Sequence, residues 1–149
     1  MDRAYFLEEK GAYEEADALV ERLLSPGSVA NADTAQMRLI RIKLNSLRLR
    51  CELLGPCRPE RIAQLLTPEL HSSLRALSRD LGAIVTLYLI AVLYEPDRAL
   101  AERQAKNLRR EFASFARNAP CRGLVALKSE MMQRADSLRA QRDRLPEQE

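Results

Sequence analysis

The sequence contains few of the residues that carry catalytic or metal chemistry. It has a single histidine, His71, and three cysteines, Cys51, Cys57 and Cys121, with no paired close spacing. Because zinc sites and disulfide frameworks need more ligands at regular spacings, neither is predicted, and the cysteines are interpreted as ordinary thiols in a reducing compartment. No P-loop, dinucleotide-binding, HExxH or GxSxG motif occurs. We therefore expect no cofactor, no metal and no enzymatic activity.

Aromatic and strand-forming residues are also scarce. Aromatic residues make up 5% of the chain and tryptophan is absent, so a base-stacking surface would be hard to build. The 46% hydrophobic and 30% charged residues are typical of a globular protein. Leucine, alanine, arginine and glutamate dominate, and these residues favour helices. The composition predicts one all-α domain over residues 1–145, followed by a frayed tail at 146–149.

No hydrophobic run is long enough to cross a membrane. The longest, Leu81 to Tyr94, has 14 residues and spans about 21 Å as a helix, whereas a bilayer core measures roughly 30 Å. Glutamates at positions 8, 9, 14 and 15 interrupt the place where the apolar core of a signal peptide would lie. These features predict a buried helix, no membrane contact and a cytoplasmic protein of bacterial type.

Apolar spacing and the positions of proline and glycine predict six or seven helices. They are expected at residues 2–24 as two pieces joined near Gly11, then at 34–54, 59–66, 67–93, 96–118 and from 120 onward. Asp33 is expected to cap the helix at residues 34–54, and the unbroken helix at residues 67–93 is the expected core element.

The 34–54 segment has two apolar stripes on nearly opposite faces. One contains Met37, Ile40, Leu44, Leu47, Cys51 and Leu54, and the other contains Leu39, Ile42, Leu49 and Leu53. A strand hairpin turning at Asn45-Ser46 is an alternative, because apolar and basic residues alternate there. The three-four spacing favours a helix, which must lie between neighbouring helices or offer one face to a partner.

Three segments of the chain resemble one another at roughly 40-residue intervals. Tyr13-Glu14 with Ala18-Leu19 recurs as Tyr94-Glu95 with Ala99-Leu100, and Pro59-Glu60-Arg61 resembles Pro96-Asp97-Arg98. The run Gly11-x-Tyr13-Glu14-Glu15-Ala16, continuing through Leu19 and Leu23 to Pro26, resembles the second helix of a tetratricopeptide repeat. The resemblance implies stacked helical hairpins with a protein-binding surface. An irregular helical bundle is the alternative.

The net charge is only +3, but its distribution is uneven. Residues 1–33 carry eight acids against three bases, and residues 34–80 carry nine bases against four acids. The basic stretches predict a groove that holds an amphipathic or acidic segment of another protein, as an adaptor, chaperone-like binder or regulator would. The charge contacts are expected from Arg38, Arg41, Arg48, Arg109 and Arg110. The same arginines are compatible with nucleic-acid binding, and the apolar stripes with a homodimer.

Overall fold

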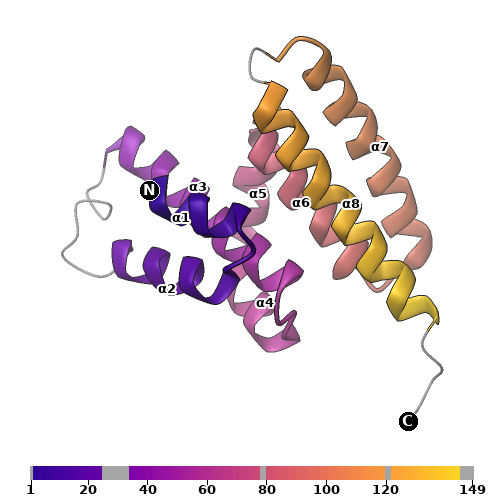
Figure 1. Cartoon of the computed structure of the whole chain (residues 1–149), viewed down its shortest axis with the longest axis horizontal. Helices are drawn as coiled ribbons and strands as arrows, with labels where there is room; N and C mark the ends of the chain where they lie inside the picture. The colour runs from indigo at the N-terminus through magenta and orange to yellow at the C-terminus, as the bar shows by residue number, and fades with distance from the viewer. Residues whose placement is uncertain (1, 25–33, 78–79, 120–121, 145–149) are drawn as a thin grey trace.

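A computed structural model describes residues 2–24, 34–77, 80–119 and 122–144, and these form eight helices and no strand (Figure 1). The fold class expected from the composition is confirmed, although the helices are more numerous than the six or seven predicted. They are α1 (Asp2–Glu9), α2 (Tyr13–Leu23), α3 (Ala35–Leu54), α4 (Pro59–Leu65), α5 (Pro68–Ala76), α6 (Leu81–Leu93), α7 (Arg98–Arg117) and α8 (Arg122–Arg144).

The helices pack as a bundle around two hydrophobic clusters. The smaller cluster joins α1, α2 and one face of α3, with Ala4, Ala16 and Val20 fully buried. The larger cluster joins the other face of α3 to α4, α5, α6, α7 and α8. Tyr13 contacts both clusters, so its ring links the two ends of the bundle.

Helix α3 is the element shared by the two clusters. Leu44, Leu47 and Cys51 lie in the smaller cluster, and Leu49 and Leu53 lie in the larger one. The prediction of a helix held between neighbours is therefore confirmed, and the strand-hairpin alternative is wrong. The helix is capped by the Thr34 side chain, which accepts a hydrogen bond from the Met37 amide at 3.1 Å. Asp33, the predicted cap, lies outside the described residues.

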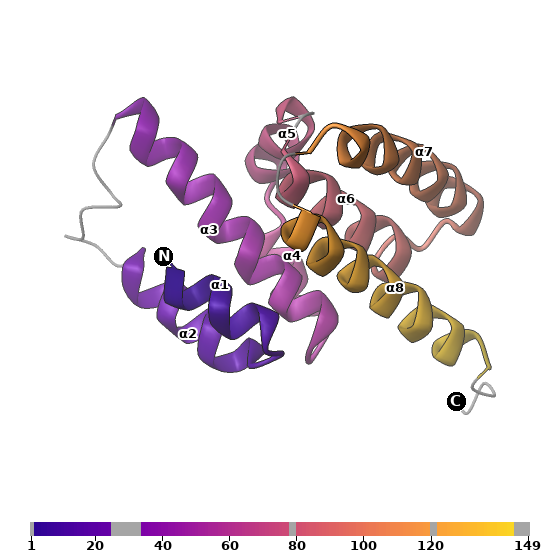
Figure 2. The same cartoon turned by 45° about the horizontal axis from the view of Figure 1, so that its top comes forward.

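Helix α6 forms the centre of the larger cluster. Eleven of its thirteen residues are buried, so it presents apolar side chains on every side, and α3, α5, α7 and α8 pack around it. Figure 2 shows α6 between α7 and α8. The buried helix predicted from the apolar run that begins at Leu81 is confirmed.

The single helix predicted over residues 67–93 is wrong, because the chain turns between α5 and α6. The Leu77 amide closes α5 by donating to Ser73 and Leu74, and Asp80 caps α6 by accepting from the Ala83 amide at 3.0 Å. Leu74, Leu81 and Ile84 keep a helix-like spacing across this turn. That spacing concealed the break, since all three residues enter the same core.

Two glycines occupy positions where a side chain would be strained or crowded. Gly11, in the turn between α1 and α2, has a φ of 80°, which L-residues with a side chain rarely adopt. At Gly55, just after α3, an added Cβ would lie 2.7 Å from the Cys51 carbonyl oxygen and 3.2 Å from the Tyr13 ring. These glycines allow the chain to turn tightly against the smaller cluster.

The segments that resemble one another in sequence occupy different places in the bundle. Tyr13 is the first residue of α2, whereas Tyr94 follows the last residue of α6. The tail predicted to fray, residues 146–149, lies outside the described residues.

Candidate functional site

A buried ion pair joins the first helix to the middle of the bundle. Arg50 is 2% exposed, and its guanidinium donates from Nε and Nη2 to the two carboxylate oxygens of Glu8, at 2.7 and 3.0 Å. Nη1 donates to the hydroxyls of Ser46 and Thr86 at 3.0 and 2.9 Å. Each guanidinium nitrogen thus has a partner, and the contact with Glu8 has the two-point geometry that suits a carboxylate.

This network holds α1, α3 and α6 together. Thr86 donates to the Gly82 carbonyl at 2.7 Å, and its oxygen lies 2.6 Å from that of Ser46. Burial alone would lower the pKa of Arg50, but the charge and hydrogen bonds of Glu8 outweigh it and raise that pKa. Arg50 therefore stays charged and serves as a structural cation of the bundle.

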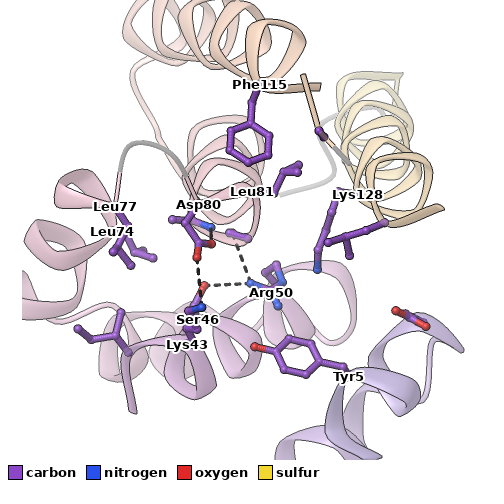
Figure 3. Close-up of a pocket in the computed structure, with 16 residues that line it drawn as sticks. Tyr5, Lys43, Ser46, Arg50, Leu74, Leu77, Asp80, Leu81, Phe115 and Lys128 are labelled. Carbon is purple, nitrogen blue, oxygen red and sulfur yellow. Dashed lines mark hydrogen bonds and ion pairs between the residues drawn. The ribbon is translucent and has the colours of Figure 1, made fainter. Parts of the chain in front are cut away.

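A pocket of about 540 Å³ opens beside this network, where the two clusters meet (Figure 3). Its wall is mostly apolar, with side chains from α3, α5, α6, α7 and α8, and α1 contributes Tyr5 and Glu9. The apolar lining residues include Ile42, Leu74, Leu77, Leu81, Phe115 and Leu124. Apolar walls with a few convergent polar groups are typical of small-molecule sites.

Two lysines of this pocket differ in their surroundings. Lys43 pairs with Asp80 at 3.5 Å and remains partly exposed. Lys128 is only 7% exposed, and its amine lies 5.9 Å from the centroid of the Tyr5 ring. Burial first, and the charge of Arg50 second, lower the pKa of Lys128 to about 8. The surroundings of Lys128 therefore disfavour its charged form.

A second hollow, of about 650 Å³, lies between α7 and α8. It exists because both helices pack mainly on α6 rather than on each other. Small apolar residues are part of its lining, namely Val92, Ala101, Ala105 and Ala140, and charged residues complete it, namely Arg98, Glu102, Lys106, Arg109, Asp136, Arg139 and Asp143. We call this hollow the α7–α8 groove.

Polar contacts fix the two sides of this groove. Tyr88 of α6 donates to the Asp136 carboxylate, and Arg109 donates to the Tyr88 oxygen at 3.1 Å. Burial and the hydrogen bond to Asp136 raise the pKa of Tyr88 to about 12. At the far end, Arg98 of α7 pairs with Asp143 of α8. These contacts therefore join α7 and α8 at two points along the groove.

The five arginines predicted to contact a partner do not meet in one site. Arg38 and Arg41 lie in the first half of α3, and Arg48 pairs with Asp17 of α2 at 2.7 Å. Arg109 lines the α7–α8 groove, and Arg110 is exposed on α7 and lines neither this groove nor the pocket beside Arg50. Arg48 therefore has a structural partner within the bundle, whereas Arg109 faces the α7–α8 groove.

Sequence reasoning did not single out Arg50 or Lys128. Arg50 is one of several bases on α3, and its partner Glu8 lies 42 residues away. Lys128 is one of several bases near the end of the chain. A signal was present, because both residues occur within apolar helical stripes where exposed bases are not expected.

Among the described residues, no cluster of three or more histidines, cysteines or acids could hold a metal ion. His71 is half-buried on α5, and its pKa is lowered by burial and by the charge of Arg75. None of the helices in the described ranges is both long enough and apolar enough to cross a membrane.

Comparison of the chain with family models, with curated proteins and with solved structures finds no match in any of the three. The function must therefore be argued from the sites themselves.

Proposed function

We propose that this protein is a non-enzymatic binding module that holds an acidic, amphipathic helical segment of another protein in the α7–α8 groove. The observation that carries the proposal is the groove itself, which two helices form by packing on a third without closing over it. A groove with an apolar floor and charged sides is the form in which proteins commonly receive an amphipathic helix.

The floor of the groove suits close approach by a helix. Ala101 and Ala105 lie one turn apart on α7, and Ala140 lies opposite on α8. Such small side chains allow an incoming backbone to come near, so that larger apolar residues of the partner fill the space. The partner's apolar stripe would then occupy the position that a further helix of the bundle would take.

The positive charge of α7 favours a partner segment with negative charge. Two of its residues are acidic, Glu102 and Glu111, whereas its basic residues are Arg98, Arg103, Lys106, Arg109, Arg110 and Arg117. Lys106 and Arg109 line the groove, and Arg103, Arg110 and Arg117 follow at seven-residue spacing along the exposed outer side. A segment with acids beside its apolar stripe complements this helix.

The resemblance of residues 11–26 to a tetratricopeptide repeat supports the same class of function, because such repeats bind protein segments. We propose adaptor, chaperone-like or regulatory roles on that basis, and an arrangement of stacked helical hairpins for the fold. Arg38 and Arg41 of α3 would then extend the basic surface toward the other end of the molecule.

Site-specific photo-cross-linking in cells tests the proposal. A photoreactive residue replaces Glu102, which lines the groove, or Ser114, which is exposed on α7 outside it. We expect the groove position to cross-link one protein through an acidic amphipathic segment, and the control position to give none of that product. Adding Lys106→Glu to the groove variant should strongly reduce the yield.

Other products would overturn the proposal and identify the alternative. Cross-links to a second copy of this chain would indicate a homodimer. Nucleic acid recovered at the groove position, with binding that falls steeply as salt rises, would indicate phosphate recognition by α7. Equal capture at both positions would show that the groove has no special role.

A further inference from the structure

We propose that the pocket beside Arg50 is a binding site for an aliphatic monocarboxylate, whose carboxylate pairs with Lys128 and whose hydrocarbon chain lies along the apolar wall. This site is separate from the α7–α8 groove, and the inference does not depend on the function proposed for that groove. Figure 3 shows Lys128, Arg50 and Tyr5 converging on the polar end of the pocket from three different helices.

The first argument is that Lys128 lacks a counter-ion. It is 93% buried, and among the described residues no acid forms an ion pair with it; its close contact is the Tyr5 ring. Buried ammonium groups are normally paired, because taking a charge out of water is costly. No side-chain nitrogen of the described residues is both fully buried and without a hydrogen bond, so the unpaired Lys128 amine keeps access to the open pocket, where it indicates a place for an anion.

Two of the three acids near Lys128 already have partners. Glu8 is bound by Arg50 through both of its oxygens. Asp80 pairs with Lys43 and caps α6 through the Ala83 amide. The third acid, Glu9, is exposed and lines the pocket, and it forms no ion pair with Lys128 among the described residues. A carboxylate brought by a ligand would therefore supply the group that Lys128 is missing.

The same surroundings limit the ligand to a single negative charge. The carboxylates of Glu9 and Asp80 line the pocket and would repel a second anionic group. Arg50 is already paired with Glu8 through two hydrogen bonds, and its Nη1 donates to Ser46 and Thr86, so its charge is balanced within the protein. A monocarboxylate fits this balance better than a phosphate or a dicarboxylate.

The apolar wall and Tyr5 define the rest of the ligand. The wall is formed by leucines and a phenylalanine, namely Leu74, Leu77, Leu81, Leu124 and Phe115. A hydrocarbon chain would remove this surface from water at about 25 cal/mol per Å². Burial raises the pKa of Tyr5, so its hydroxyl stays protonated at neutral pH and can donate to the carboxylate.

Titration of the full chain with three eight-carbon probes tests the site. Octanoate, octan-1-ol and octylamine differ in head group but share a chain of one length, and binding is measured by calorimetry. We expect octanoate to bind at least tenfold more tightly than octan-1-ol and octylamine not to bind. Lys128→Met should abolish the preference for octanoate, whereas Lys10→Met, an equal charge change outside the pocket, should keep it.

A second readout follows Lys128 directly. The chain has four lysines, so reductive ¹³C-methylation gives few signals in an NMR pH titration. Saturating octanoate should raise the pKa of Lys128 by a unit or more and leave that of Lys10 in place. Equal affinity for octanoate and octan-1-ol, no binding of octanoate, or an unmoved Lys128 pKa would each overturn the proposal.

Discussion

Glu8 and Arg50 form a two-point ion pair with almost no contact with solvent, their side chains being 1% and 2% exposed. They come from α1 and α3, and Arg50 continues the network to Thr86 of α6. The pair therefore fixes the position of the first helix against the rest of the bundle.

Removing one member of this pair should be much worse than removing both. Glu8→Leu leaves a buried guanidinium without its carboxylate, and we expect the free energy of unfolding to fall by about 3–5 kcal/mol. The double variant Glu8→Leu/Arg50→Met removes both charges and should recover most of that loss. Urea denaturation measures the free energy of unfolding of the single and the double variant. A double variant as unstable as the single one would show that the charges themselves are required.

The exposed pair of Arg98 and Asp143 is the matched control. Both side chains are more than a third exposed, at 56% and 37%. Replacing Arg98 by Met should therefore change the free energy of unfolding by about 1 kcal/mol or less.

Much of the fold could be predicted from the sequence, because the spacing of apolar residues indicates which face of a helix is buried. The opposed stripes of α3 predicted its place between two clusters, and the run from Leu81 predicted a buried helix. The turn between α5 and α6 was missed because Leu77 and Leu81 keep the helical spacing across it, although Asp80 before Gly82 was a readable cap signal.

The candidate sites were less accessible to sequence reasoning. Which of the several bases on α3 is buried depends on Glu8, a distant residue on another helix, and one sequence does not reveal that pairing. Arg109 lies in the helix that was predicted over residues 96–118. Its position in a groove depends on how α7 and α8 pack on α6, which periodicity does not specify.

Alanine at two glycines should have opposite effects. Gly55→Ala would place a Cβ 2.7 Å from a carbonyl oxygen, so the backbone must shift and we expect a loss of about 1–3 kcal/mol. Gly123→Ala lies in α8, where an added Cβ meets nothing within 4 Å. It should raise stability by up to about 1 kcal/mol through helix propensity. Thermal unfolding measures the stability of both variants. A Gly55→Ala variant as stable as the natural chain would contradict the tight turn.

Lys128 should make stability depend on pH in the alkaline range. Its pKa is about 8 in the folded chain and 10.5 as an ordinary lysine. Below pH 8 both states are protonated and the folded state bears the cost of the buried charge. Between pH 8 and 10.5 the unfolded state holds more protons, so stability rises with pH, by about 3 kcal/mol in all.

The variant Lys128→Met isolates this effect. It should be more stable than the natural chain near pH 7, and its free energy of unfolding should not rise between pH 8 and 10.5. The difference in stability between the two proteins should therefore shrink as the pH approaches 10.5. Lys10→Met should follow the natural chain. A difference between the natural chain and Lys128→Met that does not change with pH would contradict a lowered pKa.

Charge reversal should separate the predicted arginines into structural and exposed ones. Arg48→Glu would face Asp17 in a partly buried site, with side-chain exposures of 12% and 21%, and should cost about 2 kcal/mol. Arg110→Glu should change stability by less than about 0.5 kcal/mol. Helical circular dichroism during denaturation measures both, and equal losses would contradict this division.

The central claim is that the α7–α8 groove receives an acidic amphipathic helix. Its most direct test titrates the segment identified by cross-linking, as a synthetic peptide, into ¹⁵N-labelled protein. We expect amide shifts confined to residues around Ala101, Ala105 and Ala140, with affinity at least tenfold weaker for Lys106→Glu and little changed for Lys10→Glu. Shifts centred on α3, or an affinity unaffected by Lys106→Glu, would contradict it.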